Sequence, residues 1–154
     1  QMCIRDSSHA LVHRSLIAAR LKDSESLSDA LVKLMNHKIR YDSLMTNHDY
    51  DRGSCYCTDF AIGYLGIINE ALVYSHDDDI ELLPALPASG FENGTLKGIK
   101  TRNRATVTEL KWSNGGKKIS AVITSDIDQT LNVSAKGKTQ NVTFKAGESK
   151  TIIF

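Results

Sequence analysis

The sequence has few prolines and cysteines, no long apolar run and no cluster of basic and aromatic residues, and each of these absences excludes a common class of protein. Proline occurs 2 times and cysteine 3 times in 154 residues, so the chain is neither a proline-rich linker nor a small disulfide framework. No apolar run approaches the ~18 residues that a membrane span needs. The 19 basic and 18 acidic residues leave a formal net charge of +1, and Lys and Arg form no cluster with aromatic residues. We therefore expect neither a membrane nor a nucleic acid as partner.

The cysteines allow two interpretations. Cys55 and Cys57 alternate along the chain and would point the same way in an extended segment. With His48 and His76 they form one conceivable zinc set, but the spacing matches no recognised pattern of zinc ligands. We therefore expect buried free thiols, no metal and no cofactor.

The first seven residues, QMCIRDS, lack any hydrophobic period and resemble a translated adapter from assembled metagenomic reads. We exclude residues 1–7 from fold reasoning as non-native and expect the chain to be the tail of a longer protein. The start also lacks the apolar stretch of a secretory signal. Because the true start is expected upstream, the compartment stays open, and secretion or a periplasmic location is compatible with the parent protein.

The first half of the sequence has helical periodicity. Residues 9–22 carry an apolar surface wider than one stripe, and a second amphipathic helix follows, with Ser26 and Asp29 as a predicted capping box. A third helix is expected to begin with Thr58 or Asp59 as its cap and to continue to Val73. Its two glycines, at positions 63 and 66, predict close packing against a neighbouring helix.

A long polar segment separates the second and third helices. Residues 41–58 contain a glycine and show no regular period. Loops of this length inside a compact region are uncommon and are often functional.

From residue 80 onward the pattern is that of β-strands. Two prolines exclude a helix, and short segments rich in Val, Ile and Thr are bounded by turn residues. SNGGKK, between Trp112 and Ile119, predicts a hairpin turn. The expected strands cover residues 94–101, 105–112, 117–125, 129–136, 141–146 and 150–154. The sequence thus predicts an α+β fold in two parts, helices followed by an antiparallel β-sandwich.

The border between the two parts resembles a known family. SHDDDIELLPALP, residues 75–87, resembles the QSHEGEIHLLPALP segment of glycoside hydrolase family 95, the α-L-fucosidase family. Downstream, NGTLKGIKTR is similar to GSVKGLRAR of that family, and upstream AARLKDSESLSDALVKLM is similar to WARLKDGDRALKLLRLLL. The resemblance extends from about His9 to Trp112.

The resemblance implies an architecture. Residues 8–79 would be the last helices of an (α/α)6 toroidal catalytic domain, and residues 80–154 its C-terminal β-sandwich domain. Asp77, Asp78 and Asp79 would form a solvated turn that ends the last toroid helix, since acids oppose the macrodipole at a helix C-terminus. With the other toroid helices missing upstream, we expect an exposed apolar face on the second helix, formed by Leu27, Leu31 and Leu34.

The resemblance also implies a reaction. Enzymes of the family hydrolyse glycosides with inversion, using a general acid and a carboxylate base. The family's base aspartate falls on Asp59 when Glu70 is placed on the family's glutamate. The general acid would lie upstream, so we expect this chain alone to be inactive. An aspartate at this place could also serve only as a helix cap.

Three further residues are candidates for binding an oligosaccharide or glycan substrate. His48, Asp49 and Tyr56 supply an imidazole, a carboxylate and an aromatic ring, which suit sugar hydroxyls and sugar faces. A solvated polar loop is the alternative. Phe60 and Ala61 replace the family's Gly-Asn pair, so the specificity for fucose is not carried over. A non-catalytic carbohydrate-associated module and a related glycoside phosphorylase remain alternative functions.

Overall fold

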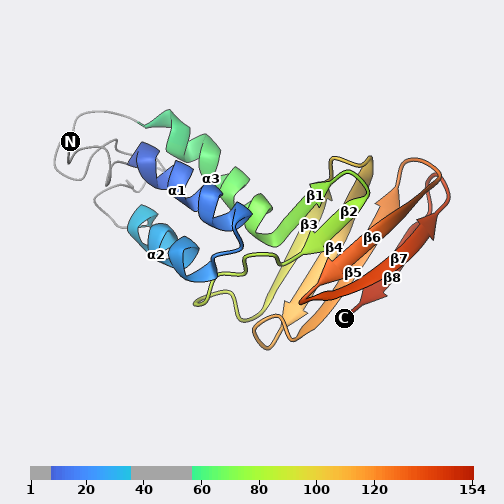
Figure 1. The fold of residues 1–154 in the computed structure, drawn as a ribbon. Helices are drawn as coiled ribbons and strands as arrows, with labels where there is room; N and C mark the ends of the chain where they lie inside the picture. The colour runs from blue at the N-terminus through green and yellow to red at the C-terminus, as the bar shows by residue number, and fades with distance from the viewer. Residues whose placement is uncertain (1–7, 36–56) are drawn as a thin grey trace. The chain divides into compact units, whose positions relative to one another are not determined.

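The computed structural model describes residues 8–35 and 57–154 (Figure 1). The chain divides into two compact units, Gln1–Ala71 and Leu72–Phe154, each with its own internal contacts. The second unit therefore begins earlier in the sequence than the expected boundary between residues 79 and 80. None of the described helices is both long enough and apolar enough to cross a membrane.

The helical unit consists of α1 (Ser8–Arg20), α2 (Ser24–Leu34) and most of α3 (Thr58–Leu72). Asp23 caps α2, because its carboxylate accepts a hydrogen bond from the backbone N–H of Ser26 at 3.0 Å. The predicted capping box of Ser26 and Asp29 is therefore wrong. Asp29 lies inside α2 and forms an ion pair with Lys33, 2.8 Å away and one turn further on.

Helices α1 and α3 approach each other closely. The Arg20 guanidinium donates two hydrogen bonds to the Glu70 carboxylate, from Nε at 2.6 Å and from Nη2 at 3.1 Å. A Cβ atom added at Gly63 would lie 2.7 Å from Cγ1 of Val12, so the missing side chain lets the two helices meet. The predicted close packing is confirmed for Gly63. It is wrong for Gly66, where an added Cβ would meet nothing within 4 Å.

The apolar residues of the helical unit are distributed differently from the expectation. Leu27 and Leu34 are 0% exposed and Leu31 is 7% exposed, so the face expected to be open is buried. Helix α2 packs against α1 within this unit, so its apolar face is not left open by the missing upstream helices. Other large apolar side chains of the helical unit are exposed instead: Ile17, Leu21, Val32, Met35, Ile62 and Leu65.

The second unit is a sandwich of two four-stranded sheets, which confirms the predicted fold class. One sheet has the order β1-β2-β6-β7 and the other β3-β4-β5-β8, as can be followed in Figure 1. All pairs are antiparallel except β2 and β6, which are parallel. The strands are β1 (Val73–His76), β2 (Asp79–Leu82), β3 (Gly94–Lys100), β4 (Ala105–Ser113), β5 (Lys118–Ser125), β6 (Gln129–Ala135), β7 (Lys138–Phe144) and β8 (Ser149–Ile153).

The acidic triplet lies in a β-hairpin and does not end a helix. Helix α3 ends at Leu72, and β1 then pairs with β2 from Val73↔Leu82 to His76↔Asp79. Asp77 and Asp78 form the turn, with Asp77 at φ 47°, while Asp79 already belongs to β2. The expected role of the triplet is thus corrected: the turn joins two strands of the sandwich.

The LLPALP segment closes one part of the sandwich core. Leu82, Leu83 and Leu86 are all buried. A Cβ atom added at Gly116, in the predicted and observed turn between β4 and β5, would lie 3.2 Å from Leu86 and 3.4 Å from Leu83. The segment that carried the family resemblance therefore packs within the sandwich unit.

Candidate functional site

The candidate base lies at the start of α3. The helix begins at Thr58, so Asp59 lies in its first turn and does not precede it. The side chain of Asp59 is not described. His48, Asp49 and Tyr56 fall outside the described residues, so the grouping of these four residues stays a prediction.

The part of α3 around Asp59 is anchored by apolar packing. Phe60 is 4% exposed and its ring contacts the Tyr64 ring edge-on, with centroids 5.9 Å apart. Cys57, immediately before the helix, is a buried free cysteine, which confirms the expected thiol at that position. Glu70 is held by Arg20 at the far end of the helix. The backbone that carries Asp59 is thus part of a packed element, which suits a group that must be held in place.

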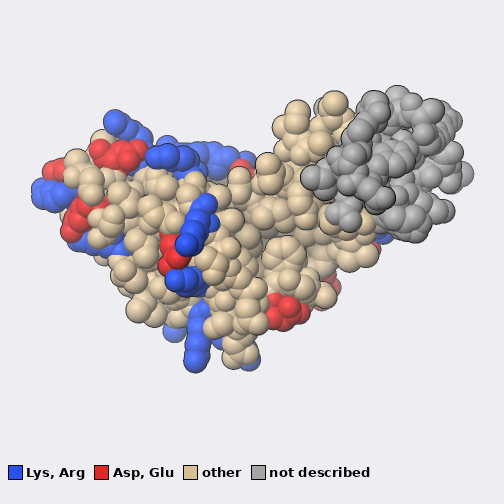
Figure 2. All heavy atoms as spheres, turned by 180° about the vertical axis from the view of Figure 1, so that it is seen from behind, with Lys and Arg blue, Asp and Glu red and all other residues tan. Residues whose placement is uncertain are grey.

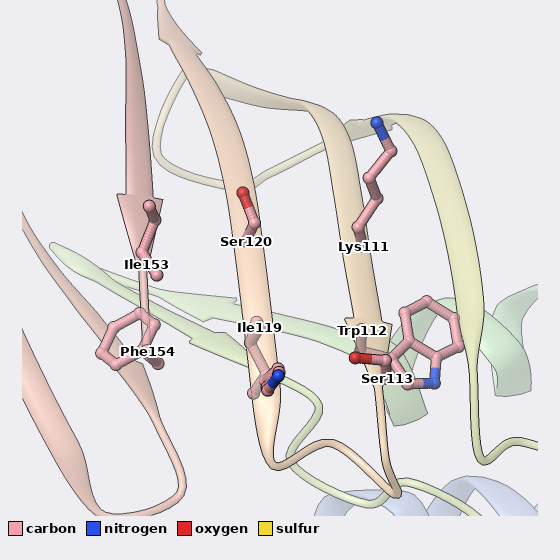
Figure 3. Close-up of a pocket in the computed structure, with 8 residues that line it drawn as sticks. Lys111, Trp112, Ser113, Ile119, Ser120, Ile153 and Phe154 are labelled. Atoms are coloured by element: carbon pink, nitrogen blue, oxygen red, sulfur yellow. The ribbon is translucent and has the colours of Figure 1, made fainter.

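The sandwich carries an apolar pocket of about 310 Å³ on β4, β5 and β8 (Figure 3). None of the described residues that line it is acidic: Lys111, Trp112, Ser113, Lys118, Ile119, Ser120, Ile153 and Phe154. The indole N–H of Trp112 donates to the carbonyl oxygen of Phe91 at 2.8 Å and is therefore already engaged. Because hydrolysis of a glycoside needs an acid and a base, this pocket cannot supply that chemistry.

A second pocket, of about 410 Å³, is polar and lies on the sheet β1-β2-β6-β7. It is lined by Tyr74, His76, Asp79, Glu81 and Ser134. The sequence reasoning missed it because it assigned Tyr74 to the last helix. The alternating burial of VYSH and DIEL, one residue in and one out, is the signal that indicates a hairpin there.

The charged residues described in the sandwich form neither a cluster of metal ligands nor a surface of one charge sign. Across residues 8–35 and 57–154 no group of three or more His, Cys, Asp or Glu side chains could hold a metal ion. Acidic and basic side chains are interspersed on the face seen in Figure 2. Some of them pair locally. Nζ of Lys111 donates a hydrogen bond to Oε2 of Glu109 at 2.6 Å. This hydrogen bond, together with the charges of Lys111 and Lys97, lowers the pKa of Glu109.

By its fold the chain belongs to the α+β class, with helices that precede a sandwich of two four-stranded sheets. A family model described as "Glycoside hydrolase family 95, C-terminal domain" matches residues 74–153, and the chain therefore belongs to glycoside hydrolase family 95. The match begins one residue into β1, two residues after the start of the second unit at Leu72.

A curated relative agrees with this membership. The chain is 40% identical over 57 residues to the protein named Alpha-L-fucosidase 2 from Arabidopsis thaliana. The aligned segment covers 37% of this chain and 7% of the length of that relative. The chain thus corresponds to a small part of the plant protein.

Proposed function

We propose that this chain is the C-terminal part of an inverting, α-L-fucosidase-like glycoside hydrolase that acts on an oligosaccharide or glycan. The observation that carries the proposal is the match of residues 74–153 to the C-terminal domain of family 95, directly after helix α3. The name of the plant relative, Alpha-L-fucosidase 2, supports a glycosidase activity, while the sugar stays open because Phe60 and Ala61 replace the family's Gly-Asn pair. Family 95 membership supports a carbohydrate as the substrate class.

In this proposal Asp59 is the general base. Its carboxylate takes a proton from water as the water oxygen attacks the anomeric carbon, while a general acid from upstream protonates the leaving oxygen. An aspartate in the first turn of a helix lies at the positive end of the macrodipole, which favours the ionised form that a base requires. The packed start of α3 supports a fixed position for it.

The polar residues before α3 would bind the sugar. His48, Asp49 and Tyr56 precede Asp59 on the same segment of chain, so they are close to it in sequence. Their side chains offer donors, acceptors and a ring surface for a sugar. Removing one of them should raise KM more than it lowers kcat, because binding contacts act in ground and transition states alike.

The reaction class is tested with the chain restored to its upstream coding sequence. Aryl α-L-fucosides and other aryl glycosides are the substrates, and ¹H NMR follows the anomer that forms first. The proposal expects the inverted anomer and a turnover that does not depend on phosphate. A retained anomer would contradict the two-carboxylate inverting mechanism, and strict phosphate dependence would establish the glycoside phosphorylase instead.

A further inference from the structure

The outer face of the sheet β1-β2-β6-β7 carries two cross-strand rows of polar residues. Alternate residues of these strands, such as Ile80 and Val133, are buried in the core, and the residues between them face outward. The register places Tyr74, Glu81 and Ser134 in one row. It places His76, Asp79, Asn132 and Asn141 in the next. The 410 Å³ pocket lies over these rows.

Side-chain hydrogen bonds fix the second row. Nδ2 of Asn141 donates to Oδ1 of Asn132 at 2.6 Å, and Nδ2 of Asn132 donates to Oδ1 of Asp79 at 2.9 Å. The amide of Asn103 also donates to the backbone carbonyl of Asp79 at 3.3 Å. A chain of oriented dipoles thus holds the Asp79 carboxylate at the edge of the pocket, so little side-chain entropy is lost when a ligand binds there.

The aromatic wall of the pocket is also fixed. The guanidinium carbon of Arg102 lies 5.9 Å from the centroid of the Tyr74 ring. Arg102 is itself held by the buried Ser75, through Nη1 to its carbonyl oxygen at 3.1 Å and through the backbone N–H to Oγ at 2.9 Å. The Tyr74 ring, half-buried in the sheet, is therefore supported by groups that are already engaged.

The lining has the chemistry of a site for a neutral polyhydroxylated ligand. Two carboxylates, Asp79 and Glu81, accept hydrogen bonds from vicinal hydroxyls, and the Ser134 hydroxyl and the His76 imidazole donate or accept. The Tyr74 ring offers an apolar surface to the C–H groups of a sugar ring. The two carboxylates disfavour an anionic ligand such as phosphate, and the volume lies within the ~300–1,000 Å³ of small-molecule sites.

We propose that this pocket is a saccharide-binding site of the sandwich unit, with a neutral sugar residue as its ligand. The proposal goes beyond the hydrolase function, because it uses no residue of α3 and does not depend on the role of Asp59. It gives the sandwich a part in holding a glycan.

The test is saturation-transfer difference NMR on the chain of residues 1–154, with L-fucose, D-galactose and D-glucose as probes. We expect at least one sugar to show saturable transfer. We expect Glu81→Gln to weaken its binding about tenfold, since a charged acceptor is replaced by a neutral one. Tyr74→Leu, which keeps an apolar side chain, should also weaken it. Glu109→Gln, on the other sheet, is the matched control and should leave binding unchanged.

Three results would overturn the proposal. The first is no transfer to any of the three sugars. The second is transfer that Glu81→Gln and Tyr74→Leu both leave unchanged while their far-UV circular dichroism matches that of the parent chain. The third is binding of putrescine, sensitive to Glu81→Gln, without sugar binding, which would assign the pocket to cations. Because this readout is equilibrium binding and the hydrolase is read by turnover, either proposal can fail while the other stands.

Discussion

At the scale of single residues, glycines and caps show how far sequence reasoning reaches. The propensity cost of Gly63 and Gly66 predicted a close neighbour for both, and only Gly63 has one, the buried Val12 on α1. Glycine in a helix signals that something is unusual, but not which side of the helix a partner occupies. Likewise Asp23, not Ser26, caps α2. The segment DSES contains several residues that can cap a helix, and only the backbone geometry decides which of them does.

The two glycines of α3 form a matched pair for a stability test. Gly66→Ala should raise the free energy of unfolding of the helical unit by about 0.5–1 kcal/mol, because alanine is the better helix former and the space is open. Gly63→Ala gains the same propensity, but it forces a methyl group against Val12, which costs about 1–3 kcal/mol. We expect a net loss there. Urea unfolding followed by circular dichroism measures both, and equal shifts would contradict the close approach of α1 and α3.

The lowered pKa of Asp128 makes the free energy of unfolding of the sandwich depend on pH. The backbone N–H of Ala146 and the ammonium of Lys145 bond to Asp128 at 2.8 and 3.0 Å and lower its pKa. A carboxyl whose folded-state pKa is depressed stabilises the fold above its unfolded pKa of about 3.9, and this contribution is lost as pH falls through the lower folded value.

The free energy of unfolding should therefore fall as the pH drops below about 5. Asp128→Asn should make the fall less steep, because the neutral amide has no proton to gain. Urea midpoints at three pH values measure this, and an equal slope for Asp128→Asn and the parent chain would contradict it.

At the scale of elements, the sequence predicts six of the eight strands and misses β1 and β2. The six carry Val, Ile and Thr between turn residues, and the positive φ of Asn114, Gly115 and Gly116 confirms the predicted turn after β4. The missed hairpin follows an apolar helix without a break in hydrophobicity, and its strands have four residues each. A period of two cannot be separated from a period of 3.6 over so short a stretch.

Because β1 pairs with β2, we predict that a stable sandwich domain must include β1 at its N-terminal end. A chain of residues 72–154 keeps β1, whereas a chain of residues 80–154 loses β1 and the first residue of β2, so that β2 pairs only with β6. Deleting β1 removes the buried Val73 and Ser75 and should lower the free energy of unfolding by about 2–4 kcal/mol. Urea unfolding of the two chains measures the difference. Equal stability would show that β1 is not an integral strand of the sandwich.

At the scale of the whole molecule, the class of the fold follows from the sequence and the catalytic site does not. The helix-to-strand transition and the LLPALP segment suffice for an α+β chain of family 95. The toroid remains a prediction, as does the grouping of Asp59 with His48, Asp49 and Tyr56. The arrangement of a long polar segment depends on the elements that surround it, and a local pattern does not encode those.

Because the helical unit exposes large apolar side chains, we predict that residues 8–154 self-associate. Ile62 and Leu65, on α3, are 77% and 68% exposed, which is unusual for large apolar side chains. We expect concentration-dependent association in sedimentation velocity, reduced by the double substitution Ile62→Lys and Leu65→Lys. Ile153→Lys, at an equally exposed position of the sandwich, is the control and should have little effect. A monodisperse monomer at all concentrations would contradict this prediction.

The most direct test of the account is the turnover of the Asp59→Asn enzyme, measured on an aryl glycoside with the upstream coding sequence restored. Loss of a general base should lower kcat by about 10²- to 10⁴-fold while the far-UV spectrum stays that of the parent enzyme. Asp126→Asn, a surface aspartate of the sandwich, should turn over normally in the same assay. An Asp59→Asn enzyme with the parent's kcat would contradict the assignment of Asp59 as the base.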